Sequence, residues 1–365
     1  MSDAAPSGSG PVRLADYTTL GLGGRAPVLY TATSEAEVAE ALRRADGAAG
    51  SPHPGALVLG GGSNLVVADD GVDVPVVRVA VPGVHVDLDA DGAAVTIGAG
   101  ENWDTVVATL VGEGWTGPES LSGIPGSVGA TPVQNVGAYG TEISDLLIDI
   151  RLYDRRTGAF RTVAAAELRL GYRSSVLRGT DAAVVTAVRL RLTRAARPVR
   201  YAELARTLGV TVGDSAPAAE VRQAVLELRR AKGMVLDPDD PDTRSAGSFF
   251  TNPILSEADM VVTGAAIAAR FGPDVSFPRY PADGGTKLSA AWLIERAGFG
   301  KGYPSKARPE AHVTVSSKHT LALTNRGGGS TAELLTLARE IRDGVREAFA
   351  VTLRPEPVLV GVSLD

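Results

Sequence analysis

Three polar side chains occur in settings that could support chemistry. Ser248 stands between a glycine and two phenylalanines, so its hydroxyl lies among small and aromatic neighbours. Arg173 occupies a short polar turn between apolar segments, and Glu356 lies between two prolines that restrict its backbone. A hydroxyl, a fixed cation and a rigid carboxylate can donate a proton and stabilise developing charge. None of the three is specific alone, because each residue type is also common in turns, on surfaces and in structural roles.

The stretch Leu121–Gly140, LSGIPGSVGATPVQNVGAYG, is rich in glycine and polar residues and carries no charge. Glycine allows main-chain N–H groups to approach a ligand closely. Such amides suit phosphate groups, so the stretch predicts a buried ligand cradle. A glycine-rich surface loop is the alternative.

A second glycine cluster follows a predicted strand at Ala56–Leu59 and covers Gly60–Leu65. A dinucleotide-binding Rossmann unit would place GxGxxG, a helix and then an acidic residue here. This chain has Leu65, an extended valine-rich continuation and Ala80 instead. The pattern predicts a strand–turn–strand device that binds a pyrophosphate through main-chain amides, or else a plain hairpin turn.

Composition narrows the class of protein. The 365 residues suggest two or three domains, and the net charge of −6 argues against nucleic-acid binding. There is no cysteine, and the four histidines are scattered, so no protein-bound metal is expected. The first residues lack the features of a signal peptide, and no run reaches the ~20 apolar residues of a membrane span. We therefore expect a disordered leader over residues 1–12 and a cytoplasmic protein.

Periodicity and capping signals place the supporting elements. Helices are expected over about 34–45, from Asn102 to about 112, and over 221–232, 287–297 and 330–350, with a further helix starting at Ser256. Strands are expected over 56–59, 66–67, 76–81, 93–99, 146–153, 160–163 and 184–192, the last three in a largely antiparallel sheet, and the C-terminal apolar run should join a sheet.

In combination, the motifs resemble one family, the UDP-N-acetylenolpyruvoylglucosamine reductases. The matching segments are GGGSNLVV (60–67), SGIPGSVGATPVQNVGAYG (122–140), GYRSS (171–175), AGSFFTNP (246–253), KLSAAWLIERAG (287–298) and RPEP (354–357). They run in the order of the family and cover nearly the whole chain after the leader. Tyr201 and the insertion after it resemble the longer subtype, which has an additional substrate-binding tyrosine.

The resemblance implies an α+β fold with a two-part FAD-binding domain of the vanillyl-alcohol-oxidase type and a C-terminal α+β substrate-binding domain. The expected boundaries are 13–75 for FAD subdomain 1, joined by a C-terminal strand at 357–365, then 76–235 for FAD subdomain 2 and 236–356 for the substrate domain. FAD is expected to be non-covalent, because the chain has no cysteine and neither glycine loop contains a histidine. The FAD-binding residues implied are Gly60, Gly61, Gly62, Ser63, Asn64, Leu65, Ser122, Gly123, Ile124, Gly126, Ser127, Gly129, Ala130 and Asn135.

The resemblance also implies a reaction, the reduction of an enol ether on a sugar nucleotide. NADPH would reduce FAD, and the enolpyruvyl group of UDP-N-acetylglucosamine enolpyruvate would then be reduced to give UDP-N-acetylmuramate for peptidoglycan synthesis. Arg173 and Glu356 would stabilise the charged intermediate, while Ser248 would protonate it. Glu356 must be protonated, or hydrogen-bonded through its acid form, to assist an anion, and Ser248 needs a polarising neighbour such as Lys232 or a water.

Four further residues are implied to bind the sugar nucleotide. They are Tyr201, Lys232, Asn252 and Tyr280. Thr251 departs from the lysine that is common at this position in relatives, which removes one possible diphosphate contact. A monomer without nucleic-acid partners or membrane insertion is expected. The alternatives are an FAD-dependent sugar or lactone oxidase of the same fold and a catalytically silent module that binds flavin or a UDP-sugar.

Overall fold

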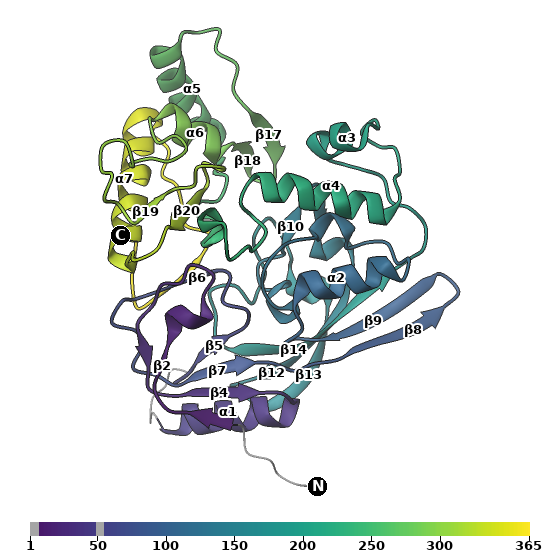
Figure 1. Cartoon of the computed structure of the whole chain (residues 1–365). Helices are drawn as coiled ribbons and strands as arrows, with labels where there is room; N and C mark the ends of the chain where they lie inside the picture. Colours follow the sequence, from purple (N-terminus) through teal and green to yellow (C-terminus); the bar gives the residue numbers. More distant parts are fainter. Residues whose placement is uncertain (1–6, 49–54) are drawn as a thin grey trace. The chain divides into compact units, whose positions relative to one another are not determined.

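A computed structural model describes residues 7–48 and 55–365, and the chain forms two compact units (Figure 1). Unit 1 consists of the described residues within 1–13, 25–62 and 72–235. Unit 2 consists of residues 14–24, 63–71 and 236–365. The glycine loop at 60–65 is therefore shared, because the chain passes from unit 1 to unit 2 between Gly62 and Ser63.

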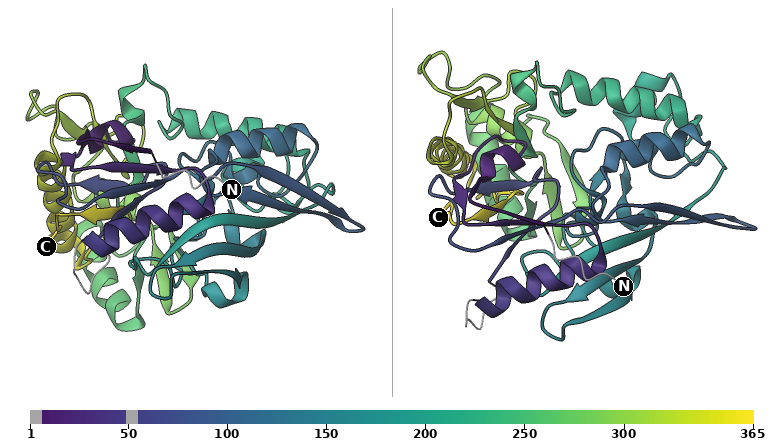
Figure 2. Two further views of the ribbon diagram at one scale, coloured as in Figure 1. Left: turned by 90° about the horizontal axis from the view of Figure 1, so that it is seen from below. Right: turned by 60° about the horizontal axis from the view of Figure 1, so that its bottom comes forward.

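The first layer of unit 1 is a four-stranded sheet in the order β1-β4-β7-β5 with one covering helix (Figure 2). Helix α1 begins after Ser34, whose hydroxyl accepts from the Glu37 amide, and buries Val38, Leu42 and Ala45 in the core with β4 and β7. The elements are β1 (Ser7–Ser9), β4 (Leu29–Ala32), α1 (Glu35–Ala48), β5 (Leu57–Leu59) and β7 (Val76–Val79), with the short pair β2 (Val12–Arg13) and β3 (Arg25–Ala26).

The expected disordered leader at 1–12 requires a correction. Residues 7–9 pair antiparallel with Leu29–Thr31, and Val12 pairs with Ala26. These contacts are made by main-chain groups, so a segment of serine and glycine gives no hydrophobic signal for them. The remainder of the leader, residues 1–6, lies outside the described residues.

The second layer of unit 1 is an antiparallel sheet in the order β13-β12-β14-β9-β8. Helix α2 is capped by Asn102, whose side chain accepts from the Thr105 amide, and it buries Trp103, Val107 and Leu110. Helix α4 packs beside α2 and α3 (Figure 1). The elements are β8 (Val84–Asp89), β9 (Gly92–Gly98), α2 (Trp103–Gly112), β10 (Gly137–Ala138), β11 (Thr141–Glu142), β12 (Leu147–Asp154), β13 (Ala159–Ala164), β14 (Ala183–Leu192), α3 (Ala202–Leu208) and α4 (Ala218–Ala231).

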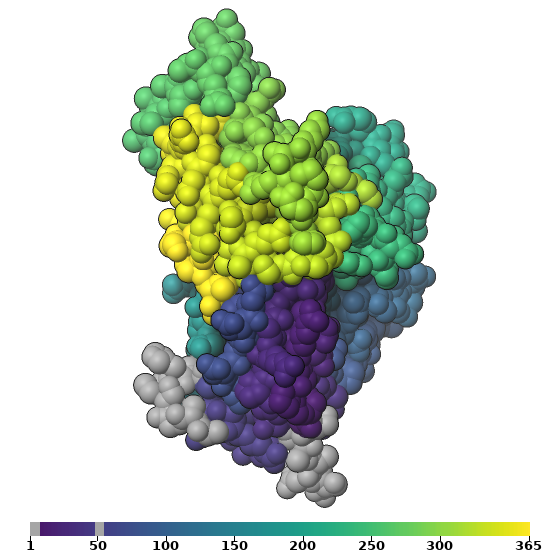
Figure 3. Space-filling model, turned by 60° about the vertical axis from the view of Figure 1, so that its left-hand side comes forward, coloured from purple at the N-terminus to yellow at the C-terminus, as the bar shows by residue number. Residues whose placement is uncertain are grey.

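Unit 2 has a core of aromatic and aliphatic side chains between short sheets and helices. Phe249, Phe250 and Phe349 are each at most 1% exposed within it. Figure 3 shows the C-terminal residues, in yellow, gathered on one face of this unit. The elements are β6 (Leu65–Val67), β15 (Ser245–Ser248), β16 (Ile254–Leu255), α5 (Glu257–Phe271), β17 (Arg279–Ala282), β18 (Gly285–Leu288), α6 (Ala290–Arg296), β19 (Val313–Val315), β20 (Ala322–Asn325), α7 (Thr331–Phe349) and β21 (Val358–Val360).

Two expectations about elements change with the structure. The helix expected over 287–297 begins only at Ala290, because Lys287 belongs to β18 and pairs with Ile254 and Tyr280. The plain hairpin at the first glycine loop is wrong, since β5 and β6 belong to different sheets. The C-terminal run does join a sheet, as expected, through the parallel pairing of β21 with β6.

No helix within 7–48 or 55–365 is both long and apolar enough to cross a membrane.

Candidate functional site

Two glycine segments of unit 1 lie against each other. A Cβ on Gly61 would lie 2.6 Å from the Cα of Gly126, and a Cβ on Gly60 would lie 2.5 Å from the Ser127 hydroxyl. No side chain larger than hydrogen fits at Gly61 without moving main chain. The two sequence motifs, about sixty residues apart, therefore form one cradle, which we call the glycine cradle (Gly60–Gly62 with Ser122–Ala130).

Helix α2 and strand β9 fix the second half of the glycine cradle. The indole N–H of Trp103 donates to the Leu121 carbonyl at 2.9 Å, and the Trp103 amide donates to the Gly126 carbonyl at 3.0 Å. The Val128 and Gly129 amides donate to the carbonyls of Glu101 and Ala99. The segment is thereby held by main-chain bonds at both ends.

Asp104 adds an electrostatic anchor to the same segment. Its carboxylate accepts from the Gly123 amide at 2.6 Å and from both terminal nitrogens of Arg222 at 2.6 and 3.1 Å. Burial opposes ionisation of this carboxyl, but these hydrogen bonds outweigh burial and hold the pKa of Asp104 below its usual value. Asp104 is therefore ionised at neutral pH and its charge is already paired.

The glycine cradle offers donors suited to a dinucleotide cofactor. The amides of Gly61, Gly126 and Ser127 make no hydrogen bond to any residue in the described part of the chain. Backbone N–H groups left open beside glycine are the donor set that a pyrophosphate requires. The residues present therefore fit FAD.

Two of the predicted cofactor residues use their side chains internally. Ser122 is 0% exposed and donates to the Glu119 carbonyl at 2.6 Å. Asn135 is 1% exposed, and its amide donates to Glu142 at 2.7 Å and to the Gly171 carbonyl at 3.1 Å. For both residues, a cofactor contact remains a prediction that only their main chains could fulfil.

Arg173 is held in the polar turn expected from the sequence. Gly171 and Ser174 exchange main-chain hydrogen bonds, and Arg173 adopts φ of 51°, an unusual conformation for a residue with a side chain. Its Nη2 donates to the Gly137 carbonyl at 2.9 Å. The Asn135 side chain also donates to the Gly171 carbonyl of this turn, so the Leu121–Gly140 stretch and the Arg173 turn are joined by a hydrogen bond.

Unit 1 also brings Tyr201 and Lys232 together around a residue that the sequence analysis did not select, Tyr139. The rings of Tyr139 and Tyr201 lie edge to face at 5.5 Å, and Lys232 Nζ lies 5.7 Å from the Tyr139 ring centroid. Lys232 also pairs with Glu203 at 2.6 Å. Tyr139 has φ of 50°, and burial raises its pKa to about 12, so its phenol remains neutral at physiological pH. The sequence signal that could have selected Tyr139 is its position inside the Leu121–Gly140 stretch.

Unit 2 places Ser248 and Glu356 on neighbouring main-chain segments. The Glu356 amide donates to the Phe249 carbonyl at 2.8 Å, directly after Ser248, and the Thr251 amide donates to the Arg354 carbonyl at 3.1 Å. The Ser248 hydroxyl makes no hydrogen bond within the described residues and is half-buried. It is therefore open to a ligand, on a segment whose main chain is bonded to that of the proline-flanked Glu356.

The end of the first glycine loop joins the same region of unit 2. The Val358 amide donates to the Asn64 carbonyl at 2.9 Å, and Leu65 pairs with Val358 in the parallel β6–β21 ladder. The C-terminal strand thus connects Asn64 and Leu65 to Glu356, two residues upstream of Val358. Ser63 is linked to this unit through a 3.5 Å bond from the Thr19 hydroxyl to its carbonyl.

The structure places Asn252 and Tyr280 further along unit 2. The Asn252 side chain accepts from the Ala290 amide at 2.9 Å and so supports the start of α6. Tyr280 lies in β17 and is 54% exposed. Their main chains belong to connected segments, since β16 begins two residues after Asn252 and pairs with β18, which also pairs with β17.

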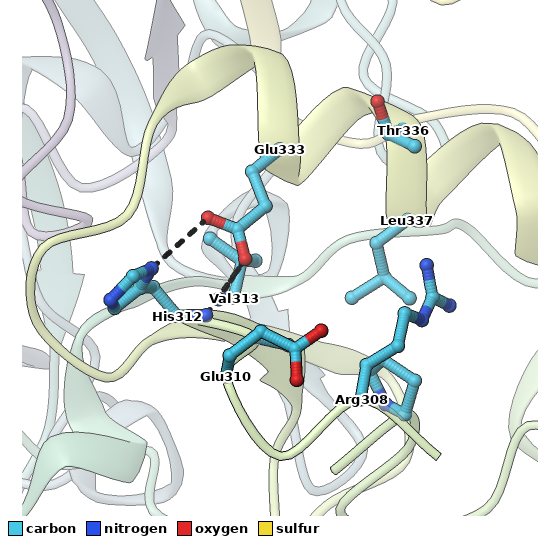
Figure 4. A pocket seen from close by; sticks show the side chains of 9 residues that line it. Arg308, Glu310, His312, Val313, Glu333, Thr336 and Leu337 are labelled. Atoms are coloured by element: carbon cyan, nitrogen blue, oxygen red, sulfur yellow. Dashed lines mark hydrogen bonds and ion pairs between the residues drawn. The ribbon is translucent and has the colours of Figure 1, made fainter.

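A separate pocket of about 400 Å³ in unit 2 contains none of the predicted residues (Figure 4). Glu333 there accepts from the amides of His312 and Val313 at 2.7 and 3.0 Å. Arg308 at its edge pairs with Glu340 at 2.6 Å. Its carboxylate Glu333 joins the start of α7 to the start of β19.

The glycine cradle and its open amides define the class of protein, an FAD-binding protein, and a family model described as "FAD binding domain" matches residues 26–164. A second model, "UDP-N-acetylenolpyruvoylglucosamine reductase, C-terminal domain", matches residues 239–360. The chain belongs to the UDP-N-acetylenolpyruvoylglucosamine reductase family and is an FAD-containing oxidoreductase.

Individual relatives cover almost the full chain. A UDP-N-acetylenolpyruvoylglucosamine reductase of Saccharopolyspora erythraea is 58% identical over 365 residues, covering 99% of this chain and 97% of the relative. One of Mycobacterium tuberculosis is 49% identical over 361 residues, covering 97% and 95%. A crystal structure of UDP-N-acetylenolpyruvylglucosamine reductase from Thermus caldophilus matches with TM-score 0.61 and 26% identity over 97% of this chain and 99% of that one. The resemblance, the fold class and FAD as cofactor are confirmed, and the oxidase alternative is not favoured.

Proposed function

We propose that this chain uses NADPH and FAD to reduce the enolpyruvyl ether of UDP-N-acetylglucosamine enolpyruvate to UDP-N-acetylmuramate. The observation that carries the proposal is the main-chain hydrogen bond from the Glu356 amide to the Phe249 carbonyl, which joins the segments of Ser248 and Glu356 in unit 2. A hydroxyl and a carboxyl group contributed by two joined segments suit delivery of one proton to a carbon that has gained negative charge. A sugar or lactone oxidase has no need of such a donor.

The glycine cradle, together with Ser63, Asn64 and Leu65, would hold FAD through main-chain groups. FAD, when bound, supplies the redox chemistry by accepting a hydride equivalent from NADPH and passing it to the enolpyruvyl group. The chain contributes orientation, exclusion of water and control of charge and protons. The open amides of Gly61, Gly126 and Ser127 support a pyrophosphate contact here. Non-covalent attachment follows from the absence of cysteine and of histidine in these loops.

Arg173 and Glu356 are assigned to stabilise the negative charge that develops on the substrate carboxylate. The Arg173 guanidinium is always cationic and can form two parallel hydrogen bonds to a carboxylate. Its attachment to Gly137 fixes the side chain in advance, which is the condition for electrostatic stabilisation of a transition state. Glu356 supports the same anion in its protonated form.

Ser248 is assigned as the proton donor to the α-carbon. A serine hydroxyl is a weak acid, so it needs a strongly basic carbanion or a polarising neighbour, a role we propose for Lys232 or a bound water. The half-buried, unbonded hydroxyl supports this role because no competing acceptor in the described chain has to be displaced.

Tyr201, Lys232, Asn252 and Tyr280 are assigned to the sugar nucleotide. The Tyr139–Tyr201–Lys232 arrangement supports the first two, since a cation and aromatic faces together suit a phosphorylated sugar or a base. The proposed protein is a cytoplasmic monomer whose partners are small molecules. The three structural domains expected from the sequence, with boundaries at 75, 235 and 356, remain a proposal.

The test separates the two halves of the reaction. Ser248→Ala should still allow NADPH to bleach the flavin at the wild-type rate, while return of colour on adding the sugar nucleotide slows by at least a thousandfold. The reason is that NADPH reduces the flavin first, whereas the proposed proton donor acts only afterwards, when the sugar nucleotide is reduced. Ser305→Ala, at an exposed serine of the same unit, is the matched control. Equal loss of both halves in Ser248→Ala would show that Ser248 is not the proton donor.

A further inference from the structure

Arg229, on the last turn of α4, is a buried cation that forms no ion pair with any residue in 7–48 or 55–365. It is 9% exposed, and its Nη2 donates to the Met234 carbonyl at 2.8 Å. Its Nε is buried and makes no hydrogen bond within the described part of the chain. Burial lowers the pKa of the guanidinium, although an arginine remains charged at any physiological pH.

The neighbours of Arg229 do not neutralise it. Asp104 is the acidic residue that acts on it, but that carboxylate is already bonded to Arg222 and to the Gly123 amide. Tyr139 is the other group that acts on Arg229, and its phenol is neutral because burial holds its pKa at about 12. The described residues of unit 1 therefore do not compensate the positive charge.

Arg229 lies directly behind the glycine cradle. A Cβ on Gly123 would lie 3.3 Å from Arg229 Nε, and Leu226 and Val235 close the same space at 2.9 and 3.0 Å. Gly123 has φ of 71°, so glycine is also required by the backbone here. The guanidinium thus faces the main chain of the segment proposed to line the flavin.

An uncompensated buried charge is costly to a fold, so its presence indicates an anion supplied from outside the chain. Flavins acquire negative charge on reduction, and charges near the ring tune how readily they are reduced. Lys232, one turn further along the chain, faces Tyr139 and pairs with Glu203, which separates it from the Gly123 side. Arg229 lies at Gly123, in the segment proposed to line the flavin, so the anion that it faces is the flavin and not the sugar nucleotide.

We propose that Arg229 is a tuning residue for the cofactor: its positive charge, acting across Gly123, stabilises the reduced state of the bound FAD and so favours its reduction by NADPH. The inference rests on the proposed function, because it takes the flavin to lie along Ser122–Ala130. It assigns no proton transfer and no substrate contact to Arg229.

The test is the equilibrium between bound FAD and a redox dye of known potential, measured anaerobically without NADPH or sugar nucleotide. Arg229→Gln removes the charge and keeps a donor for the Met234 carbonyl, while Arg229→Lys keeps the charge. Arg230→Met removes a charge from the exposed neighbouring position on the same helix and is the matched control. We expect Arg229→Gln to shift the equilibrium at least tenfold towards oxidised FAD, which is about 30 mV for a two-electron couple. Arg229→Lys and Arg230→Met should stay within threefold of wild type.

Binding of oxidised FAD to the apoprotein, followed by flavin fluorescence, keeps the result interpretable. Since oxidised flavin is neutral in its ring system, Arg229→Gln should weaken this binding less than it weakens binding of the reduced form.

A yellow Arg229→Gln protein with the wild-type dye equilibrium would overturn the inference and leave the proposed function intact. A wild-type protein that binds no FAD would instead overturn the proposed function. If Arg229→Gln does not fold, a shift of tenfold or more towards oxidised FAD in Arg229→Lys, which keeps the charge, would contradict the role of charge at this position.

Discussion

At the scale of single residues, the glycine cradle depends on contacts that admit no side chain. Gly61 and Gly126 approach so closely that a methyl group on Gly61 would lie 2.6 Å from the Gly126 Cα and 2.9 Å from its carbonyl carbon. Neither atom can move like the end of a flexible side chain, because both are main chain. A methyl group at position 61 must therefore change the main-chain geometry of the glycine cradle.

Gly61→Ala should bind FAD at least tenfold more weakly than wild type, a loss of about 1.4 kcal/mol. Titration of apoprotein with FAD, followed by flavin fluorescence, measures the change. Gly112→Ala is the control, since a Cβ there meets nothing within 4 Å and Gly112 lies in helix α2. Unchanged FAD affinity in Gly61→Ala would show that the cradle does not hold the cofactor.

The sequence offers candidate residues where a motif carries the information, and it offers none where side chains act at a distance. Ser248, Arg173 and Glu356 could be selected because each lies in a recognisable segment. Arg229 could not, because its importance comes from burial and from neighbours far away in the chain, Asp104, Gly123 and Tyr139. No local pattern around Arg229, in a helix that also contains Arg222 and Arg230, marks it as the buried one.

At the scale of elements, local capping signals predicted several helix starts well. Ser34, Asn102, Ser256 and Ser330 each precede a helix and accept a hydrogen bond from a main-chain amide of its first turn. Strand β8 was missed because its side chains are mostly exposed, with Leu88 72% exposed, so it lacks an apolar face. Lys287 was assigned to a helix because strand pairing with Tyr280 and Ile254 leaves no local signal.

The loop before β15 depends on one buried carboxylate, Asp242, which is 3% exposed. It accepts from the amide of Ser317 at 2.9 Å, from the hydroxyl of the same residue, and from Arg326 at 3.3 Å. Burial opposes its ionisation, but the Ser317 hydrogen bonds outweigh burial and lower the pKa of Asp242 from the usual 3.8. The loop leads into the strand that ends at Ser248.

Asp242→Asn should lower the free energy of unfolding by about 2 kcal/mol at pH 7, because an amide nitrogen faces donors that the carboxylate accepted. The folded pKa is depressed, so the stabilising effect is fully present above the unfolded pKa. It is lost as the pH falls through the folded value. The difference between variant and wild type in urea unfolding should therefore shrink below about pH 4. Asp239→Asn, at an exposed position, should show no such difference, and a pH-independent gap for Asp242→Asn would contradict the explanation.

At the scale of the whole molecule, the chain combines two compact units, and the residues assigned to FAD belong to both. Gly60–Gly62 and Ser122–Ala130 are part of unit 1, whereas Ser63–Leu65 are part of unit 2. The sequence predicted the fold class through family motifs. It did not predict that residues 14–24 and 63–71 group with the C-terminal unit, because that grouping arises from long-range contacts such as the Thr19 hydroxyl bond to the Ser245 carbonyl at 2.7 Å.

Cofactor attachment gives a prediction for the intact protein. Acid precipitation of the purified yellow protein should leave all of the flavin in the supernatant, because the chain has no cysteine and no histidine in either glycine loop. Free FAD at about a hundred times its Kd should stabilise the apoprotein by about 2.7 kcal/mol, seen as a higher Tm. A coloured pellet after precipitation would contradict non-covalent binding.

The most direct single measurement is anaerobic stopped-flow absorbance of the flavin band in the purified holoprotein. NADPH is added first, and UDP-N-acetylglucosamine enolpyruvate is added after the flavin has been reduced. We predict bleaching by NADPH and full recovery of colour with the sugar nucleotide, accompanied by one equivalent of UDP-N-acetylmuramate per flavin. Bleaching without recovery, or recovery only on admitting oxygen, would contradict the reductase function and favour an oxidase of the same fold.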